Sequence, residues 1–235
     1  MSTDVRIDPE VLTATIEGAP VRVLSLLLGG VPRGATAVIA GPDGLDEIAA
    51  VETMNALAQH GYESVLTFDM TEGGGAAVVD HLVALLADRG WEEEQIAVVG
   101  YGQGARAALE AAARRTFGAA VSLPREPRQL LVPEPVTALH TAWLGMVGLG
   151  EGRTLPSELT AYRDDLGAQS VEHTRLVGYP GTEHCLRDST DPLEHAASFD
   201  AWQRTAEWLN THVVPRPTPL AKAWRERQTS LQSTS

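Results

Sequence analysis

The fold of this chain is decided by residues 96–108, which read IAVVGYGQGARAA. The segment opens with four apolar residues, which is typical of a strand buried on both faces of a sheet. Glycines then alternate at Gly100, Gly102 and Gly104, and a run of this kind is typical of a tight turn. The alanine-rich sequence that follows favours a helix. Strand, turn and helix in this order indicate an α/β fold with a mostly parallel sheet.

The rest of the chain repeats this alternation on both sides of the segment. A strand pair is predicted at 12–16 and 21–26, and single apolar strands are predicted at 37–40, 64–69, 119–123, 138–147 and 174–179. Helices are predicted at 46–60, from the glycines at 73–75 to Gly90, at 104–115, at 156–166 and at 198–212. The short links between them predict one α/β domain with helices on both faces of its sheet.

The composition bounds the domain count, the partners and the compartment. A chain of 235 residues with 43% hydrophobic content can bury one substantial core, which we assign to residues 1–214. Basic residues number 18 against 31 acidic ones, a formal charge of −13 that argues against nucleic acid or an anionic membrane as partner. Residues 215–235 differ, with a basic sequence that we expect to be partly disordered or docked on the acidic body.

The single cysteine and the N-terminal sequence indicate where the protein acts. Cys185 alone excludes an internal disulfide and fits a reducing compartment. The N-terminal residues 1–6 have neither a basic region nor an apolar core of the kind found in signal peptides. No apolar run approaches the roughly 20 residues of a membrane span. A cytoplasmic location is therefore expected.

The glycine turn has three interpretations. Residues 100–104, GYGQG, have the frame G-x-S-x-G of a nucleophile elbow, with Gly102 at the nucleophile position. Residues 100–105 also fit the dinucleotide turn G-x-G-x-x-A, although the next predicted strand, 119–123, ends without the acid that would bind a ribose. The third interpretation is that the glycines only allow the strand and the helix to pack tightly.

A histidine loop favours the elbow interpretation. His184 lies in a loop rich in glycine and proline, directly after the last predicted strand at 174–179. In folds with such an elbow, the catalytic residues follow in the order nucleophile, acid, histidine, and His184 stands where that order requires the histidine. The alternative is an ordinary surface histidine.

At these residues the chain resembles the dienelactone hydrolase family. Residues 99–105, VGYGQGA, look like the family elbow V-G-Y-C-x-G-G with the cysteine replaced by Gly102. Residues 179–186 resemble its histidine loop Y-x-G-x-x-H-G-F, and residues 37–70 are similar in their order of strand, loop, helix and strand. The resemblance spans about residues 10–213 and implies an α/β-hydrolase fold and chemistry on a small molecule.

The resemblance also implies a partner for the histidine. The family acid follows the penultimate strand in a G-x-x-D setting, and this chain has Gly148-Leu149-Gly150-Glu151 there. Glu151 is therefore the expected triad acid, the alternative being a solvated loop carboxylate. A glutamate that the family carries near its first glycine loop is replaced by Gly41-Pro42.

Without a nucleophile, the chemistry expected at this site is not covalent. Gly102 offers no group for attack, but His184 can act as a general base. The backbone N–H of Gln103 and one from the loop at Asp43 and Gly44 are expected to hold an oxyanion. The expected reactions are cyclisation, isomerisation, elimination or water-mediated hydrolysis of a carbonyl compound.

The remaining expectations are broader. Tyr101 and Gln103 flank the empty position and either donate a hydrogen bond there or serve packing and capping. Cys185 is expected to be a small buried residue, with a role as replacement nucleophile as the alternative. Two other functions stay open: a pseudo-hydrolase that binds a ligand or a partner, and a hydrolase of small esters or lactones with a non-standard nucleophile. We expect a small-molecule ligand, no cofactor and no metal.

Overall fold

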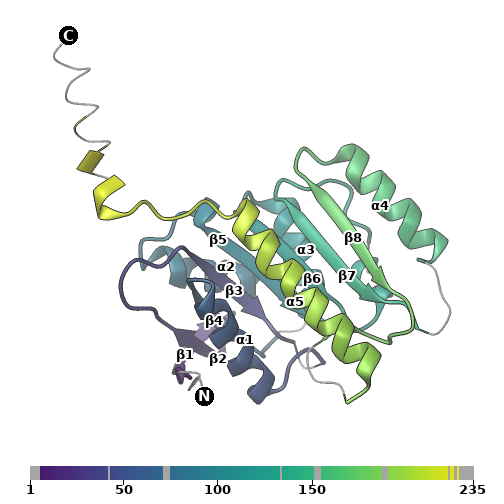
Figure 1. Ribbon diagram of the computed structural model, residues 1–235, viewed down its shortest axis with the longest axis horizontal. Helices are drawn as coiled ribbons and strands as arrows, with labels where there is room; N and C mark the ends of the chain where they lie inside the picture. Colours follow the sequence, from purple (N-terminus) through teal and green to yellow (C-terminus); the bar gives the residue numbers. More distant parts are fainter. Residues whose placement is uncertain are drawn as a thin grey trace, which may run out of the picture.

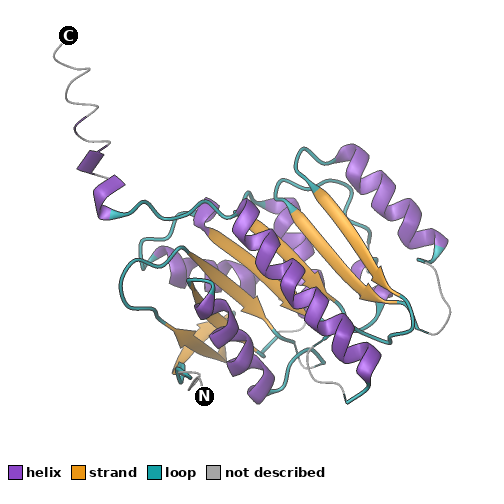
Figure 2. Ribbon diagram, in the orientation of Figure 1, coloured by secondary structure: helices purple, strands orange, loops and turns teal. Residues whose placement is uncertain are grey.

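The computed structural model shows one sheet with helices on both of its faces (Figures 1 and 2). The residues that it describes are 6–41, 43–70, 75–132, 134–150, 155–186, 190–221, 223–224 and 227.

The eight strands of the sheet follow the order β1-β2-β4-β3-β5-β6-β7-β8. Their bounds are β1 Glu10–Ile16, β2 Ala19–Leu26, β3 Gly34–Ile39, β4 Tyr62–Thr67, β5 Ile96–Tyr101, β6 Ala119–Leu123, β7 Trp143–Gly148 and β8 Thr174–Tyr179. Strand β2 pairs antiparallel with β1 and with β4, and all other pairs are parallel. The mostly parallel sheet expected from the sequence is confirmed.

Five α-helices cover the sheet in the described part of the chain. Their bounds are α1 Glu47–Gln59, α2 Gly75–Ala87, α3 Gly104–Arg114, α4 Ser157–Gln169 and α5 Pro192–His212. Helices α1 and α5 share one core cluster on one face of the sheet, and α2, α3 and α4 pack on the other face (Figure 1). Two short 3₁₀ turns, Glu93–Gln95 and Pro127–Leu130, precede β5 and follow β6.

The largest differences from the predicted bounds are at the starts of two elements. Helix α5 begins at Pro192 rather than at 198, because the side chain of Asp191 caps it by accepting from the N–H groups of Leu193 and Glu194. Proline in the first turn of a helix loses no hydrogen bond there, so this start is a stable one. Strand β7 begins at Trp143 rather than at 138, since the residues before it connect the 3₁₀ turn Pro127–Leu130 to the sheet without pairing with a strand.

The first part of the basic tail packs against the domain. The guanidinium of Arg216 lies 3.6 Å from the ring centre of Trp91 and donates to the carbonyl oxygens of Arg89 and Gly90. Its backbone N–H donates to the carbonyl of Arg33 at 2.8 Å. Most of the tail beyond residue 221 lies outside the described residues.

Within the described ranges, no helix combines the length and the apolar character needed to cross a membrane.

Candidate functional site

The turn between β5 and α3 has the geometry of an elbow. Gly102 has a φ of +56°, a left-handed conformation that glycine adopts without the steric cost of a side chain. Its N–H donates to the carbonyl of Leu123 at 2.9 Å, and its own carbonyl accepts from the N–H of Ala105 at 3.1 Å. The turn therefore presents residue 102 at the carboxyl ends of the central strands.

The flanking glycines allow α3 to approach the sheet. A Cβ on Gly100 would overlap the carbonyl of Gly104, and a Cβ on Gly104 would overlap the carbonyl of Ile39. Tight packing and an elbow are thus properties of the same turn, and the two interpretations do not exclude each other.

The carboxylate of Asp43 occupies the space that a side chain at residue 102 would need. A Cβ built on Gly102 would lie 2.5 Å from Oδ1 of Asp43, 2.8 Å from its carbonyl carbon and 2.7 Å from the backbone nitrogen of Gly44. The loop after β3 therefore closes over the elbow. An acidic side chain therefore fills the space next to Gly102, the position that the sequence analysis interprets as that of a nucleophile.

Two amide groups hold Asp43 there. The backbone N–H of Gln103 donates to Oδ1 at 2.8 Å, and Nε2 of Gln129 donates to Oδ2 at 2.8 Å. The orientation of the Gln129 amide is itself fixed, because its Oε1 accepts from the backbone N–H groups of Arg125 and Glu126. Asp43 is half-buried. The two hydrogen bonds that Oε1 of Gln129 accepts fix the amide that in turn holds the Asp43 carboxylate.

Gln129 was missed by the sequence analysis. Its signal is local: Glu126 and Gln129 form a capping box on the 3₁₀ turn Pro127–Leu130. The capping box predicts the turn, but not that the amide of Gln129 reaches a residue on another loop.

The expected oxyanion contact and the Asp43 contact use the same donor. Gln103 N–H points to the place predicted for an oxyanion, and Oδ1 of Asp43 is the acceptor that it meets. The second expected donor, the N–H of Gly44, lies 3.4 Å from the carbonyl oxygen of Gly41. A substrate oxygen can bind to Gln103 N–H only after Asp43 has moved.

His184 lies on the loop after β8, folded over the end of β7. A Cβ on Gly148, the last residue of β7, would lie 2.5 Å from the backbone nitrogen of His184. Strand β7 is two positions from β5 in the sheet, so the two loops start about 10 Å apart. The imidazole is half-buried, and its Nδ1 is buried with no hydrogen-bond partner in the described residues. Nδ1 is the atom that an orienting acid would contact.

The expected acid, Glu151, lies outside the described residues. Gly150, just before it, is hydrogen-bonded to the histidine loop: its N–H donates to Thr182 and its carbonyl accepts from Gly181. Backbone hydrogen bonds therefore join the loop that follows β7 to the histidine loop, at residues that precede His184.

The other two predicted residues have side chains in the interior. Tyr101 is 3% exposed and belongs to the core cluster that α1 and α5 share. Cys185 is 1% exposed, its thiol donates to the carbonyl of Met146, and burial raises the pKa of that thiol to about 12. A buried thiol with this pKa is a poor nucleophile, in agreement with the small buried residue expected.

In the part of the chain that the structure describes, no group of three or more His, Cys, Asp or Glu side chains could hold a metal ion.

Comparison with known proteins agrees with this arrangement. The model of the dienelactone hydrolase family matches residues 41–213, which include Asp43, the elbow and His184. No functionally curated protein matches the sequence.

Solved structures share the fold at low sequence identity. A candidate dienelactone hydrolase from Klebsiella pneumoniae is 18% identical with a TM-score of 0.61, over 86% of this chain and 99% of that one. The 2,6-dihydroxy-pseudo-oxynicotine hydrolase is 17% identical with a TM-score of 0.65, over 88% and 68%. Esterase 2 of Thermogutta terrifontis, phosphorylated by paraoxon, is 14% identical with a TM-score of 0.67, over 91% and 98%. These likenesses confirm the α/β-hydrolase fold.

Proposed function

The chain belongs to the dienelactone hydrolase family, and from this membership we propose a small-molecule enzyme that acts on a carbonyl compound without forming an acyl-enzyme. His184 is its general base. The observation that carries the proposal is the carboxylate of Asp43, held by two amides in the space of the missing nucleophile. A proton acceptor at this place suits acid–base chemistry better than acyl transfer.

Covalent acyl transfer is unsuited to the side chains of this site. Gly102 has no nucleophilic atom, and the Cys185 thiol is buried with a pKa of about 12. An activated nucleophile must lie within hydrogen-bond reach of its base, and neither residue offers one.

Asp43 retains capacity to bind a substrate group. An ionised carboxylate has about four acceptor positions, and in the described residues Gln103 and Gln129 use one on each oxygen. A remaining position can accept from a substrate hydroxyl or from a water molecule. Asp43 would then orient this group while His184 takes a proton from it or from a carbon next to the carbonyl.

This chemistry covers the reactions expected from the sequence. Proton removal next to a carbonyl begins an isomerisation, a cyclisation or an elimination, and proton removal from water begins a hydrolysis. The proposal includes a small-molecule ligand, no cofactor, no metal and a cytoplasmic location. Support for the location comes from the single cysteine and the acidic composition.

The test is a panel of lactones, small esters and 2-oxo acids followed by NMR in deuterium oxide, which reports both hydrolysis and exchange of carbon-bound protons. His184→Ala should lower turnover by about 10²–10⁴-fold. His140→Ala, which removes an exposed histidine elsewhere, should change nothing. Full turnover in His184→Ala, or a covalent acyl adduct on the protein in mass spectra, would overturn the proposal.

A second candidate function is a pseudo-hydrolase that binds a ligand. It is favoured by one observation: Asp43 caps the Gln103 amide, which closes the expected oxyanion position. This function predicts no turnover on the panel and unchanged ligand affinity in His184→Ala. Asp43→Ala should then increase affinity for carbonyl ligands, because it frees that N–H.

A further inference from the structure

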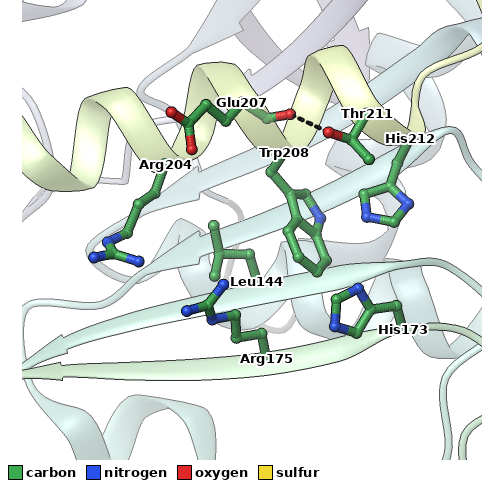
Figure 3. Close-up of a pocket in the computed structure, with 8 residues that line it drawn as sticks. All are labelled: Leu144, His173, Arg175, Arg204, Glu207, Trp208, Thr211 and His212. Atoms are coloured by element: carbon green, nitrogen blue, oxygen red, sulfur yellow. Dashed lines mark hydrogen bonds between the residues drawn. The ribbon is translucent and has the colours of Figure 1, made fainter.

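A separate pocket lies between α5 and the edge strand β8 (Figure 3). Its volume is about 260 Å³. The residues that line it are Leu144, His173, Arg175, Arg204, Glu207, Trp208, Thr211 and His212.

The pocket is far from the elbow. Leu144 is near the start of β7 and His173 directly precedes β8, so the pocket lies at the amino ends of these strands. The elbow and the His184 loop lie at the carboxyl ends of the strands, and Arg204 is the lining residue that extends furthest toward them, since Asp200, its partner, accepts from the hydroxyl of Tyr179 at the end of β8. The pocket is therefore no part of the site described above.

Two arginines reach into the gap from opposite sides. Arg175 extends from β8 toward α5, and Arg204 extends from α5 toward β8 (Figure 3). Arg175 pairs with Leu144 in the sheet register, which places it on the face that α5 covers. In the described residues, the Arg175 guanidinium has no hydrogen bond or ion pair. Arg204 donates its Nε to Asp200 at 2.5 Å, and the hydroxyl of Tyr179 donates to the same carboxylate oxygen, so a ligand would reach this guanidinium through its terminal amino groups.

Three rings form the wall beside the arginines. The rings of His173 and His212 lie 4.9 Å and 4.4 Å from that of Trp208, measured between centroids. Trp208 is only 7% exposed and donates its ring N–H to the carbonyl of Ala142, so with the two histidine rings it forms a fixed wall in which little of the indole itself is open. A flat ring packs well against such a surface.

The pocket gathers two guanidinium groups in an acidic protein, one of them paired with Asp200. The chain carries a formal charge of −13, yet Arg175 and Arg204 gather here. Glu207 is the one carboxylate among the lining residues, and its side chain runs along α5 toward the Arg204 end of the helix segment drawn (Figure 3). Guanidinium groups bind carboxylate and phosphate through paired N–H donors, so an anion is the ligand that fits.

We propose that this pocket binds a small organic anion that carries a flat ring, with its carboxylate or phosphate on Arg175 and Arg204 and its ring against the wall of His173, Trp208 and His212. The volume is just below the roughly 300–1,000 Å³ of pockets for drug-sized ligands, which indicates a smaller molecule. The proposal is independent of the chemistry at His184.

The test is isothermal titration of the full chain with benzoate, with phenyl phosphate and with neutral benzyl alcohol. At least one of the two anions should bind, and the stronger of them identifies the anionic group. Benzyl alcohol should bind at least about tenfold more weakly. Arg175→Ala should weaken the anion about tenfold, and because the Arg175 guanidinium makes no hydrogen bond or ion pair in the described residues this variant should fold normally.

Two control variants locate the site. Arg163→Ala removes the same charge from α4, where Arg163 pairs only with Asp164 among the described residues, and should not change the affinity. His184→Ala should also bind as the wild type does. The proposal is wrong if neither anion binds, if benzyl alcohol binds equally well, or if Arg175→Ala binds as tightly as Arg163→Ala.

Discussion

Replacing Gly102 by alanine is expected to destabilise the protein by about 2–5 kcal/mol, from two separate causes. The φ of +56° is left-handed, and this conformation costs a residue with a Cβ about 1–2 kcal/mol. The new Cβ would also lie 2.5 Å from Oδ1 of Asp43 and 2.7 Å from the nitrogen of Gly44, and overpacking of this kind costs about 1–3 kcal/mol. The Asp43 side chain can rotate away, but the backbone of Gly44 moves only with its loop.

The matched control is Gly18→Ala. Gly18 is also left-handed, with a φ of +83°, but a Cβ there meets nothing within 4 Å. Its substitution should cost only the conformational part, about 1–2 kcal/mol. Urea unfolding of both variants at an unchanged m-value gives the two free energies, and their difference is the steric part. Adding Asp43→Ala to Gly102→Ala should recover about 1 kcal/mol, because it removes the nearest atom.

The reasoning is refuted if Gly102→Ala and Gly18→Ala lose stability within about 0.5 kcal/mol of each other. Equal losses would mean that the loop at Asp43 and Gly44 moves aside without cost. The elbow would then have room for a side chain, and the assignment of this space to Asp43 would be wrong.

Three further predictions concern the site and the far pocket. The double variant Gly102→Ser, Asp43→Ala should hydrolyse p-nitrophenyl acetate faster than Gly102→Ser alone. Adding His184→Ala to the double variant should abolish this gain. A folded double variant without activity would contradict the elbow interpretation. Iodoacetamide at pH 8 should leave Cys185 unmodified in the folded protein and alkylate it after unfolding, because the thiol is 1% exposed with a pKa of about 12; rapid alkylation of the folded protein would contradict this. Burial, and then the neighbouring His173, lower the pKa of His212 from its ordinary 6.5. The unfolded chain therefore binds a proton at His212 more readily than the folded protein does, and the free energy of unfolding should fall as the pH drops below about 6.5. His212→Gln should make the urea midpoint less dependent on pH between 5 and 7.5 (an unchanged dependence would exclude His212 as the cause).

Most of the fold could be predicted because its signals are local. Each central strand is a short apolar run, and each helix has a periodic apolar face bounded by glycine or proline. The predicted start of α5 is six residues later than the observed one, because residues 192–197, which follow the cap Asp191, have no strong apolar face. Parallel pairing followed from the alternation of elements rather than from any single residue.

The site could be predicted only where it is local. The elbow turn and the histidine loop are each read from a few adjacent residues. The contacts of Asp43 are not of this kind, since Gln103 is 60 positions away and Gln129 is 86. An Asp-Gly pair after a strand has the same sequence signature whether its carboxylate faces solvent or another loop. Tyr101 shows the same limit, because alternation along β5 turns its side chain into the core while Gly102 faces the site.

The glycine at the nucleophile position and the aspartate above it depend on each other. A serine or cysteine at residue 102 would need the volume that Asp43 now fills, and a loop that admitted such a side chain would leave Asp43 without its bond to Gln103. Restoring a nucleophile is therefore not the reversal of one substitution. The absence of a side chain at 102, the rotamer of Asp43 and the amide of Gln129 that holds it form one arrangement. If residue 102 is the nucleophile position, as we propose, the loss of a side chain there has not left the space empty, because Asp43 fills it and occupies the Gln103 amide.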